Sequence, residues 1–136
     1  MDGDAVAGRL RVVGVRVERV SGRVAVVVSL GYDGAVVTGR ADRATGETQT
    51  IQVAAEAVLE AIRQVAPGQT RWGLEQVAIQ PMLGGPAVVA HILLEAEGTS
   101  EHLIGSALGR SGPLEEAAAE AVLDAVERRL GWFTKN

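Results

Sequence analysis

The chain has 136 residues, of which 47% are apolar and 22% are charged, and it contains no cysteine. This length fits one compact domain and is too short for a catalytic barrel or a full dinucleotide-binding fold, which need about 200 residues or more. The absence of cysteine excludes a disulfide scaffold, a thiol nucleophile and a cysteine zinc site. A net charge of −4 and an aromatic content of only 3% argue against a nucleic-acid binder.

The first residues give no sign of export. Met1-Asp2-Gly3-Asp4 is acidic where a secretory signal is basic, and no apolar segment follows it. Apolar runs such as 24–28 are much shorter than the roughly 20 residues that span a bilayer. We therefore expect a soluble, cytoplasmic protein.

The sequence contains an internal repeat. Segment 54–62, AAEAVLEAI, recurs 64 residues later as 118–126, AAEAVLDAV. Carried back along the chain, the same offset pairs Leu10 with Leu74 and Val24 with Val88. The repeat predicts an N-terminal tail over 1–9, a first unit over 10–66, a linker over 67–73, a second unit over 74–130 and a C-terminal tail over 131–136.

Within each unit the hydrophobic pattern predicts three strands followed by a helix. The expected strands are 13–18, 24–30 and 35–41 in the first unit and 74–82, 87–94 and 101–108 in the second. Apolar residues spaced four and three apart from Ile51 to Val65 predict an amphipathic helix, with Thr48 and Thr50 as rival N-caps. The second helix is expected between Pro113, suited to its first turn, and Gly131, suited to the position after its end. The predicted fold class is α/β of the α+β type, a two-layer architecture of tandem duplicated βββα units with pseudo-twofold symmetry.

The middle strand of each unit is apolar on both faces, although a sheet with one solvated face normally alternates. Because the helices cover one face, we expect the other to pack against a second sheet, from the sister unit or from another chain. The alternative is a poorly shielded, valine-rich sheet. The expected interface residues on this second face are Ala25, Val27, Val89, His91 and Leu93.

Two groups of polar residues are candidates for a catalytic or metal site. With a turn centred on Gly98-Thr99, His91 and His102 fall on one face about 13 Å apart, which is too far to share a metal. His91 is therefore interpreted as a packed or interface residue and His102 as a surface residue. Glu95, Glu97 and Glu101 are interpreted as a solvated hairpin tip. We expect no catalytic residue, no metal site and no cofactor.

The arginines are concentrated in the first unit, among them Arg16 and Arg19, which have opposite parity on one strand. A dispersed, solvated pattern is favoured over an RNA-binding face. We therefore expect neither nucleic acid nor a membrane as a partner.

The segment before the second helix is the best candidate for ligand binding. Glycines let backbone N–H groups approach a ligand closely, and a helix N-terminus attracts anions. The candidate ligand-binding residues are Gly109, Ser111, Gly112 and Pro113. The alternative is an ordinary turn and helix cap.

Tandem βββα units with a Gly-Pro turn entering an alanine-rich helix resemble the C-terminal allosteric (dimerisation) domain of 2-isopropylmalate synthase and citramalate synthase. Members of that family carry a G-x-G-P-hydrophobic-acidic-A segment, and Gly109, 111–115 (SGPLE) and Ala117 form a loose version of it. The resemblance implies a domain that dimerises and binds a small amino acid or keto acid near these turns. The first unit departs from the pattern, because Gly46-Glu47 lacks the proline. Synthase activity is not implied, because the 136 residues contain no catalytic barrel.

We therefore expect a non-enzymatic regulatory or small-ligand-binding module that forms homo-oligomers. Its candidate partners are a second copy of the chain, a small-molecule effector and a regulated protein. The alternative is a purely structural assembly protein that acts through homo-oligomerisation by its apolar sheet face. An enzyme ranks third.

Overall fold

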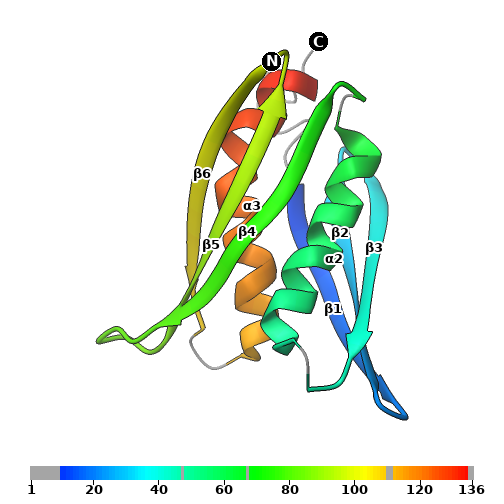
Figure 1. Cartoon of the computed structure of the whole chain (residues 1–136), viewed down its shortest axis with the longest axis vertical. Coiled ribbons are helices and arrows are strands. Elements are labelled where there is room, and N and C mark those ends of the chain that lie inside the picture. The colour runs from blue at the N-terminus through cyan, green and yellow to red at the C-terminus, as the bar shows by residue number, and fades with distance from the viewer. Residues whose placement is uncertain (1–9, 47, 67, 110–111, 135–136) are drawn as a thin grey trace.

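The computed structural model describes residues 10–46, 48–66, 68–109 and 112–134, with only the backbone described for 128 and 130–134. The elements in chain order are β1 (Leu10–Val20), β2 (Arg23–Tyr32), β3 (Ala35–Ala44), α2 (Thr50–Val65), β4 (Thr70–Gln80), β5 (Ala87–Ala96), β6 (Thr99–Leu108) and α3 (Leu114–Thr134) (Figure 1). This order confirms the predicted fold class, an α+β chain of tandem βββα units. In the described part of the chain, no helix has both the length and the hydropathy needed to cross a bilayer.

Each unit contains one antiparallel three-stranded sheet, with the order β1-β2-β3 in sheet A and β4-β5-β6 in sheet B. Equivalent two-residue turns join the second and third strands. Asp33 and Gly34 have φ values of 53° and 82°, and Glu97 and Gly98 have 53° and 80°. Two successive left-handed residues match the twist of a tight hairpin. The turns therefore fix the same register in both units.

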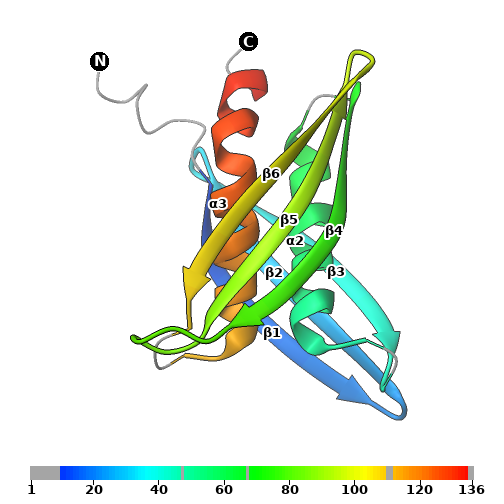
Figure 2. The ribbon, with the colours of Figure 1, turned by 60° about the vertical axis from the view of Figure 1, so that its left-hand side comes forward.

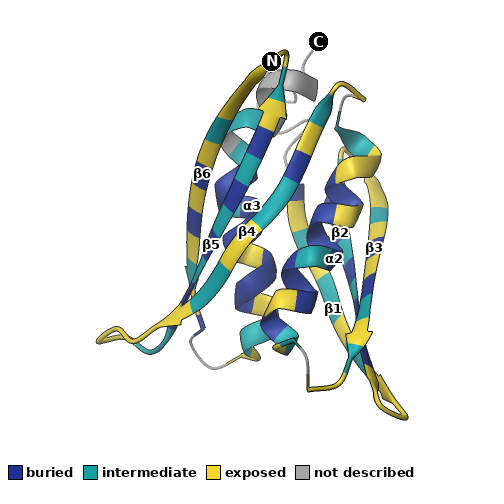
Figure 3. Cartoon of the chain, viewed as in Figure 1, coloured by how far each residue is buried: buried dark blue, intermediate teal, exposed yellow. Residues whose placement is uncertain are grey.

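The two helices lie side by side between the sheets, α2 on sheet A and α3 on sheet B (Figures 1 and 2). Each helix also contacts the other unit, α2 through β4 and α3 through β1. The inward faces of the sheets and helices form one buried core, visible in Figure 3 along the sides of the helices that face the sheets. The inward residues of the middle strands are Val24, Val26, Val28 and Leu30 in β2 and Val88, Ala90, Ile92 and Leu94 in β5.

Two glycines allow the helices to lie directly on the sheets. A Cβ atom on Gly39 would overlap the carbonyl oxygen of Ala57 and lie 2.6 Å from the backbone nitrogen of Ala61. A Cβ atom on Gly105 would overlap the backbone of Ala121 and Ala125 in the same way. The alanine pairs are 64 residues apart but the glycines are 66 apart, so the close crossing is displaced by two strand residues between the units.

The second unit begins earlier than predicted. β4 starts at Thr70, inside the predicted linker 67–73 and before the predicted start at Leu74. The β4–β5 connection spans 81–86, whereas the β1–β2 turn contains only residues 21 and 22. These four additional residues make β1 and β4 equivalent at an offset of 60 rather than 64. The pairing of Leu10 with Leu74 is therefore wrong, and Leu10 corresponds to Thr70, since their strand partners Tyr32 and Ala96 are 64 residues apart.

The predicted helix ends also need correction. The backbone of α3 continues through Gly131 to Thr134, so the predicted tail over 131–136 begins as helix. A glycine inside a helix costs about 1 kcal/mol, which alone does not end it. The N-cap of α2 is Gln49, without a side-chain capping bond, instead of Thr48 or Thr50.

Candidate functional site

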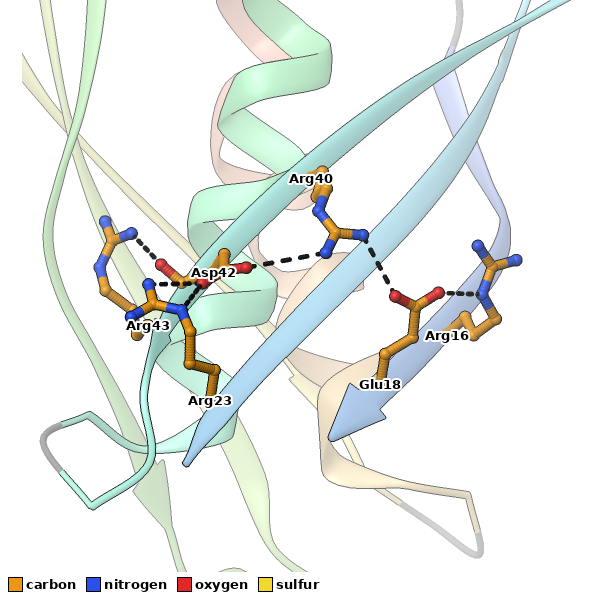
Figure 4. Close-up of polar contacts among 6 residues, drawn as sticks. All are labelled: Arg16, Glu18, Arg23, Arg40, Asp42 and Arg43. Atoms are coloured by element: carbon orange, nitrogen blue, oxygen red, sulfur yellow. Dashed lines mark hydrogen bonds and ion pairs between the residues drawn. The ribbon is translucent and has the colours of Figure 1, made fainter. Parts of the chain in front are cut away.

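The outer face of sheet A, which points away from the helices, is crossed by an ion-pair ladder of Arg16, Glu18, Arg40, Asp42 and Arg23 (Figure 4). Glu18 accepts hydrogen bonds from Arg16 Nε at 2.9 Å and from Arg40 Nη1 at 3.1 Å. Arg40 Nη2 lies 3.7 Å from Asp42 Oδ2, and Arg23 Nε donates to Asp42 Oδ1 at 2.6 Å. The hydrogen bonds from Arg16 and Arg40 lower the pKa of Glu18.

The ion-pair ladder surrounds the two residues of sheet A that were predicted to form an interface. In the sheet register, Ala25 lies between Glu18 and Asp42, and Val27 lies between Arg16 and Arg40. Ala25 is buried and Val27 half-buried within the single chain. Charged side chains with mutual partners are well suited to water, so this face of sheet A is suited to solvent.

The outer face of sheet B has no such ladder. The positions equivalent to Arg16 and Glu18, at the offset of 60, are Gln76 and Ala78. The positions equivalent to Arg23, Arg40 and Asp42, at the offset of 64, are Ala87, Ile104 and Ser106. All five charges of the ladder are therefore replaced by neutral side chains.

We call this surface the neutral face. It comprises the outward residues Gln76, Ala78, Gln80, Ala87, Val89, His91, Leu93, His102, Ile104, Ser106 and Leu108. Ile104 is 50% exposed and Leu108 is 41% exposed, and the predicted interface residues Val89, His91 and Leu93 are half-buried. The register places the charged residues Arg71 and Glu95 on the same side toward one end of the strands, and the exposed Glu75 is the unpaired residue of the β4 bulge next to Gln76.

The two histidines meet on the neutral face. His91 Nε2 and His102 Nδ1 are 2.7 Å apart in a hydrogen bond, so the predicted separation of about 13 Å is wrong. The turn is Glu97-Gly98 rather than one centred on Gly98-Thr99, and this register makes the histidines diagonal neighbours on adjacent strands. Among the described side chains of one chain, no group of three or more His, Asp or Glu residues is placed to hold a metal.

The predicted ligand-binding loop is only partly described, because Ser111 lies outside the described residues. The N–H of Gly109 donates to the carbonyl of Pro86 at 2.8 Å, and a Cβ atom on Gly109 would lie 2.7 Å from Leu114 Cδ2. Gly109 thus serves the packing of the helix entry. A Cβ atom on Gly112 would lie 3.2 Å from Glu116 Oε1, so a carboxylate already occupies the region where an anion would bind.

A cavity of about 380 Å³ lies between β3 and α2 and was not predicted. Arg43 Nη2 and Glu56 Oε1 form an ion pair at 2.6 Å beside it, and Arg63 Nη2 donates to the Trp72 carbonyl at 2.8 Å. Its lining residues are Arg40, Ala41, Asp42, Arg43, Glu56, Leu59, Glu60, Arg63 and Leu74. The sequence showed dispersed arginines, and only the packing of α2 on β3 brings them opposite the acidic side chains of the helix.

The second unit lacks this arrangement. Glu120 is equivalent to Glu56, but the position equivalent to Arg43 is Ala107. Burial, followed by the carboxylates of Glu116 and Glu127, raises the pKa of Glu120. The charge pairs of the cavity are thus a feature of the first unit.

No protein-family model and no curated protein matches the chain. The resemblance to the 2-isopropylmalate synthase C-terminal domain therefore stays a prediction. The duplicated fold, the neutral face and the cavity are the features from which a function is argued.

Proposed function

We propose that this chain is a non-enzymatic module that associates with a second copy of itself through the neutral face of sheet B. One observation carries the proposal: five charged positions on sheet A are neutral at the equivalent positions of sheet B. Both units have the same fold, so the fold requires neither the charged residues of sheet A nor the neutral residues of sheet B at these positions. Charge depletion at the centre of a surface patch is the compositional signal of a protein interface.

A second copy suits this face better than a charged partner does. In a twofold interface the same patch meets itself, so a patch rich in one charge would repel its copy, whereas a neutral patch does not. The three strands of sheet B have 11, 10 and 10 residues and cover about 33 Å by 14 Å, or roughly 450 Å² per chain. About 900 Å² in total is below the roughly 1,200 Å² that stable interfaces bury, so we expect a weak dimer.

The β4–β5 connection adds to this surface. It projects from the end of sheet B (Figures 1 and 2), and Met82 and Leu83 on it are 56% and 108% exposed. The sister unit has only a two-residue turn at this place. Apolar side chains on a longer loop next to the neutral face are expected to extend the contact with the second copy.

The test transfers part of the ion-pair ladder to sheet B. The double variant Ala78→Glu, Ile104→Arg restores the equivalents of Glu18 and Arg40, which can pair with each other and keep the monomer folded. We expect wild-type protein to sediment as a dimer, and this variant to sediment as a monomer with an unchanged circular dichroism spectrum. The cost of burying charges in the interface is several kcal/mol.

The matched control is Val36→Arg, at an apolar position on the outer side of sheet A that is 61% exposed. This variant is expected to sediment like the wild type. A wild-type chain that is monomeric at all concentrations, or a double variant with the wild-type mass, would contradict the proposal.

A second candidate function, binding of a small regulatory ligand, is favoured by the charged cavity between β3 and α2. Guanidinium and carboxylate groups lie there beside Leu59 and Leu74, which fits a zwitterion with a short apolar side chain. The test is a thermal-shift titration with branched-chain amino acids, 2-keto acids, nucleotides and inorganic anions. A ligand at about 100 times its dissociation constant should stabilise the chain by about 2.7 kcal/mol.

The site of any such ligand is checked with Arg63→Gln, which should abolish the shift, and with Arg16→Gln on the outer face, which should keep it. A shift that persists in Arg63→Gln would place the ligand elsewhere. No saturable shift with any compound would leave homo-association as the function.

A further inference from the structure

His91 lies near the centre of the neutral face, and its partner His102 lies one row further along, beside Leu93. His91 is in the middle of β5, the central strand of sheet B, and pairs with Gln76 on β4 and Ile104 on β6. The two ring nitrogens that meet are His91 Nε2 and His102 Nδ1, 2.7 Å apart. We infer that these nitrogens form half of a zinc site, which the same pair of a second copy completes. This inference rests on the proposed association through the neutral face.

The geometry of the pair is close to that of two metal ligands. Zinc–nitrogen bonds of about 2.0–2.1 Å in a tetrahedral site place the nitrogens roughly 3.3 Å apart. The two nitrogens must therefore separate by only a few tenths of an ångström, and His102 is exposed, so its ring has room to move. The imidazole that donates the hydrogen bond would carry its proton on its other ring nitrogen instead, so both converging nitrogens become lone-pair donors without net proton release.

The fold itself does not require histidines at these two positions. The equivalent residues of the first unit are Val27 and Thr38, at the same places in a sheet of the same register. The strand partners of the pair, Gln76, Leu93 and Ile104, are uncharged, and the exposed Glu75 lies in the β4 bulge before Gln76. A site whose ligands are imidazoles selects Zn²⁺, Cu²⁺ or Ni²⁺ over Mg²⁺ and Ca²⁺.

One chain supplies two ligands, and a structural zinc site needs four. A twofold axis that gives the greatest overlap of two neutral faces passes near their centre, where a residue meets its own copy. The central position of His91 therefore brings the two histidine pairs together. The completed site has four imidazoles and one zinc ion for two chains.

The experiment compares metal-free protein in EDTA with the same protein titrated with Zn²⁺ alone, by native mass spectrometry and sedimentation. We expect one zinc per two chains and a dimer dissociation constant that falls about tenfold or more with zinc. The double variant His91→Val, His102→Thr carries the residues of the sister unit. It should keep the dimer seen in EDTA and lose the response to zinc.

The other outcomes separate the two proposals. A dimer with the same dissociation constant with and without zinc overturns the zinc site and leaves the proposed association intact. One zinc per chain with no change in mass also overturns it, because the pair is then a weak chelate of the monomer. A chain that stays monomeric in EDTA and in zinc overturns both proposals.

Discussion

Replacing Gly105 with alanine is expected to lower the free energy of unfolding by about 3 kcal/mol. The added Cβ atom would overlap the backbone of Ala121 and lie 2.9 Å from Ala125 Cα. Neither contact is the end of a flexible side chain, so relief requires α3 to move away from sheet B. Such a movement opens contacts along the whole helix, because α3 packs on β5 and β6 at once and touches β1 and α2.

The matched control is Gly14→Ala on the outer side of β1. A Cβ atom on Gly14 has no neighbour within 4 Å, and its φ is not positive. Alanine there should be neutral or stabilise the chain by up to about 1 kcal/mol, because it restricts the unfolded chain. Urea denaturation followed by circular dichroism measures both variants. Equal stability of the two variants would show that the close approach of α3 to sheet B is not rigid.

The repeat predicted the elements well where the two units have the same length. From β2 to the start of the helix the offset of 64 holds, because the turns between the second and third strands both contain two residues. The offset of 64 is wrong for β4, because the β4–β5 connection has four additional residues. The offset came from the repeated helix segments, which carry no information on the length of that loop. The helix was predicted to end before Gly131, but it continues, because one glycine inside a helix costs only about 1 kcal/mol.

The candidate site depended on register more than on composition. A turn misplaced by one residue changed the expected separation of His91 and His102 from hydrogen-bonding distance to about 13 Å. The middle of the outward side is apolar in both strands, with Ala25 and Val27 in β2 and Val89 and Leu93 in β5, so sequence alone ranked Val27 beside Val89. The two valines differ only in the residues beside them on the adjacent strands. Which residues these are depends on the register of all three strands.

Truncating either of two equivalent leucines is expected to unfold both units together. Leu30 is 0% exposed and Leu94 is 3% exposed, and both belong to the single core that spans the two units. Leu30→Ala and Leu94→Ala should each lower the free energy of unfolding by about 3 kcal/mol, through lost burial and a residual cavity. Because α2 contacts β4 and α3 contacts β1, neither unit can keep its core when the other unfolds.

The measurement uses Trp72, which is 2% exposed and lies in β4 of the second unit, in a Trp132→Phe background. Leu30→Ala is in the first unit, yet it should shift the urea midpoint of Trp72 fluorescence as far as that of circular dichroism. Two coincident transitions indicate one cooperative domain. If Trp72 instead kept its wild-type midpoint in Leu30→Ala, the second unit would be stable alone, and the neutral face could then associate without the first unit.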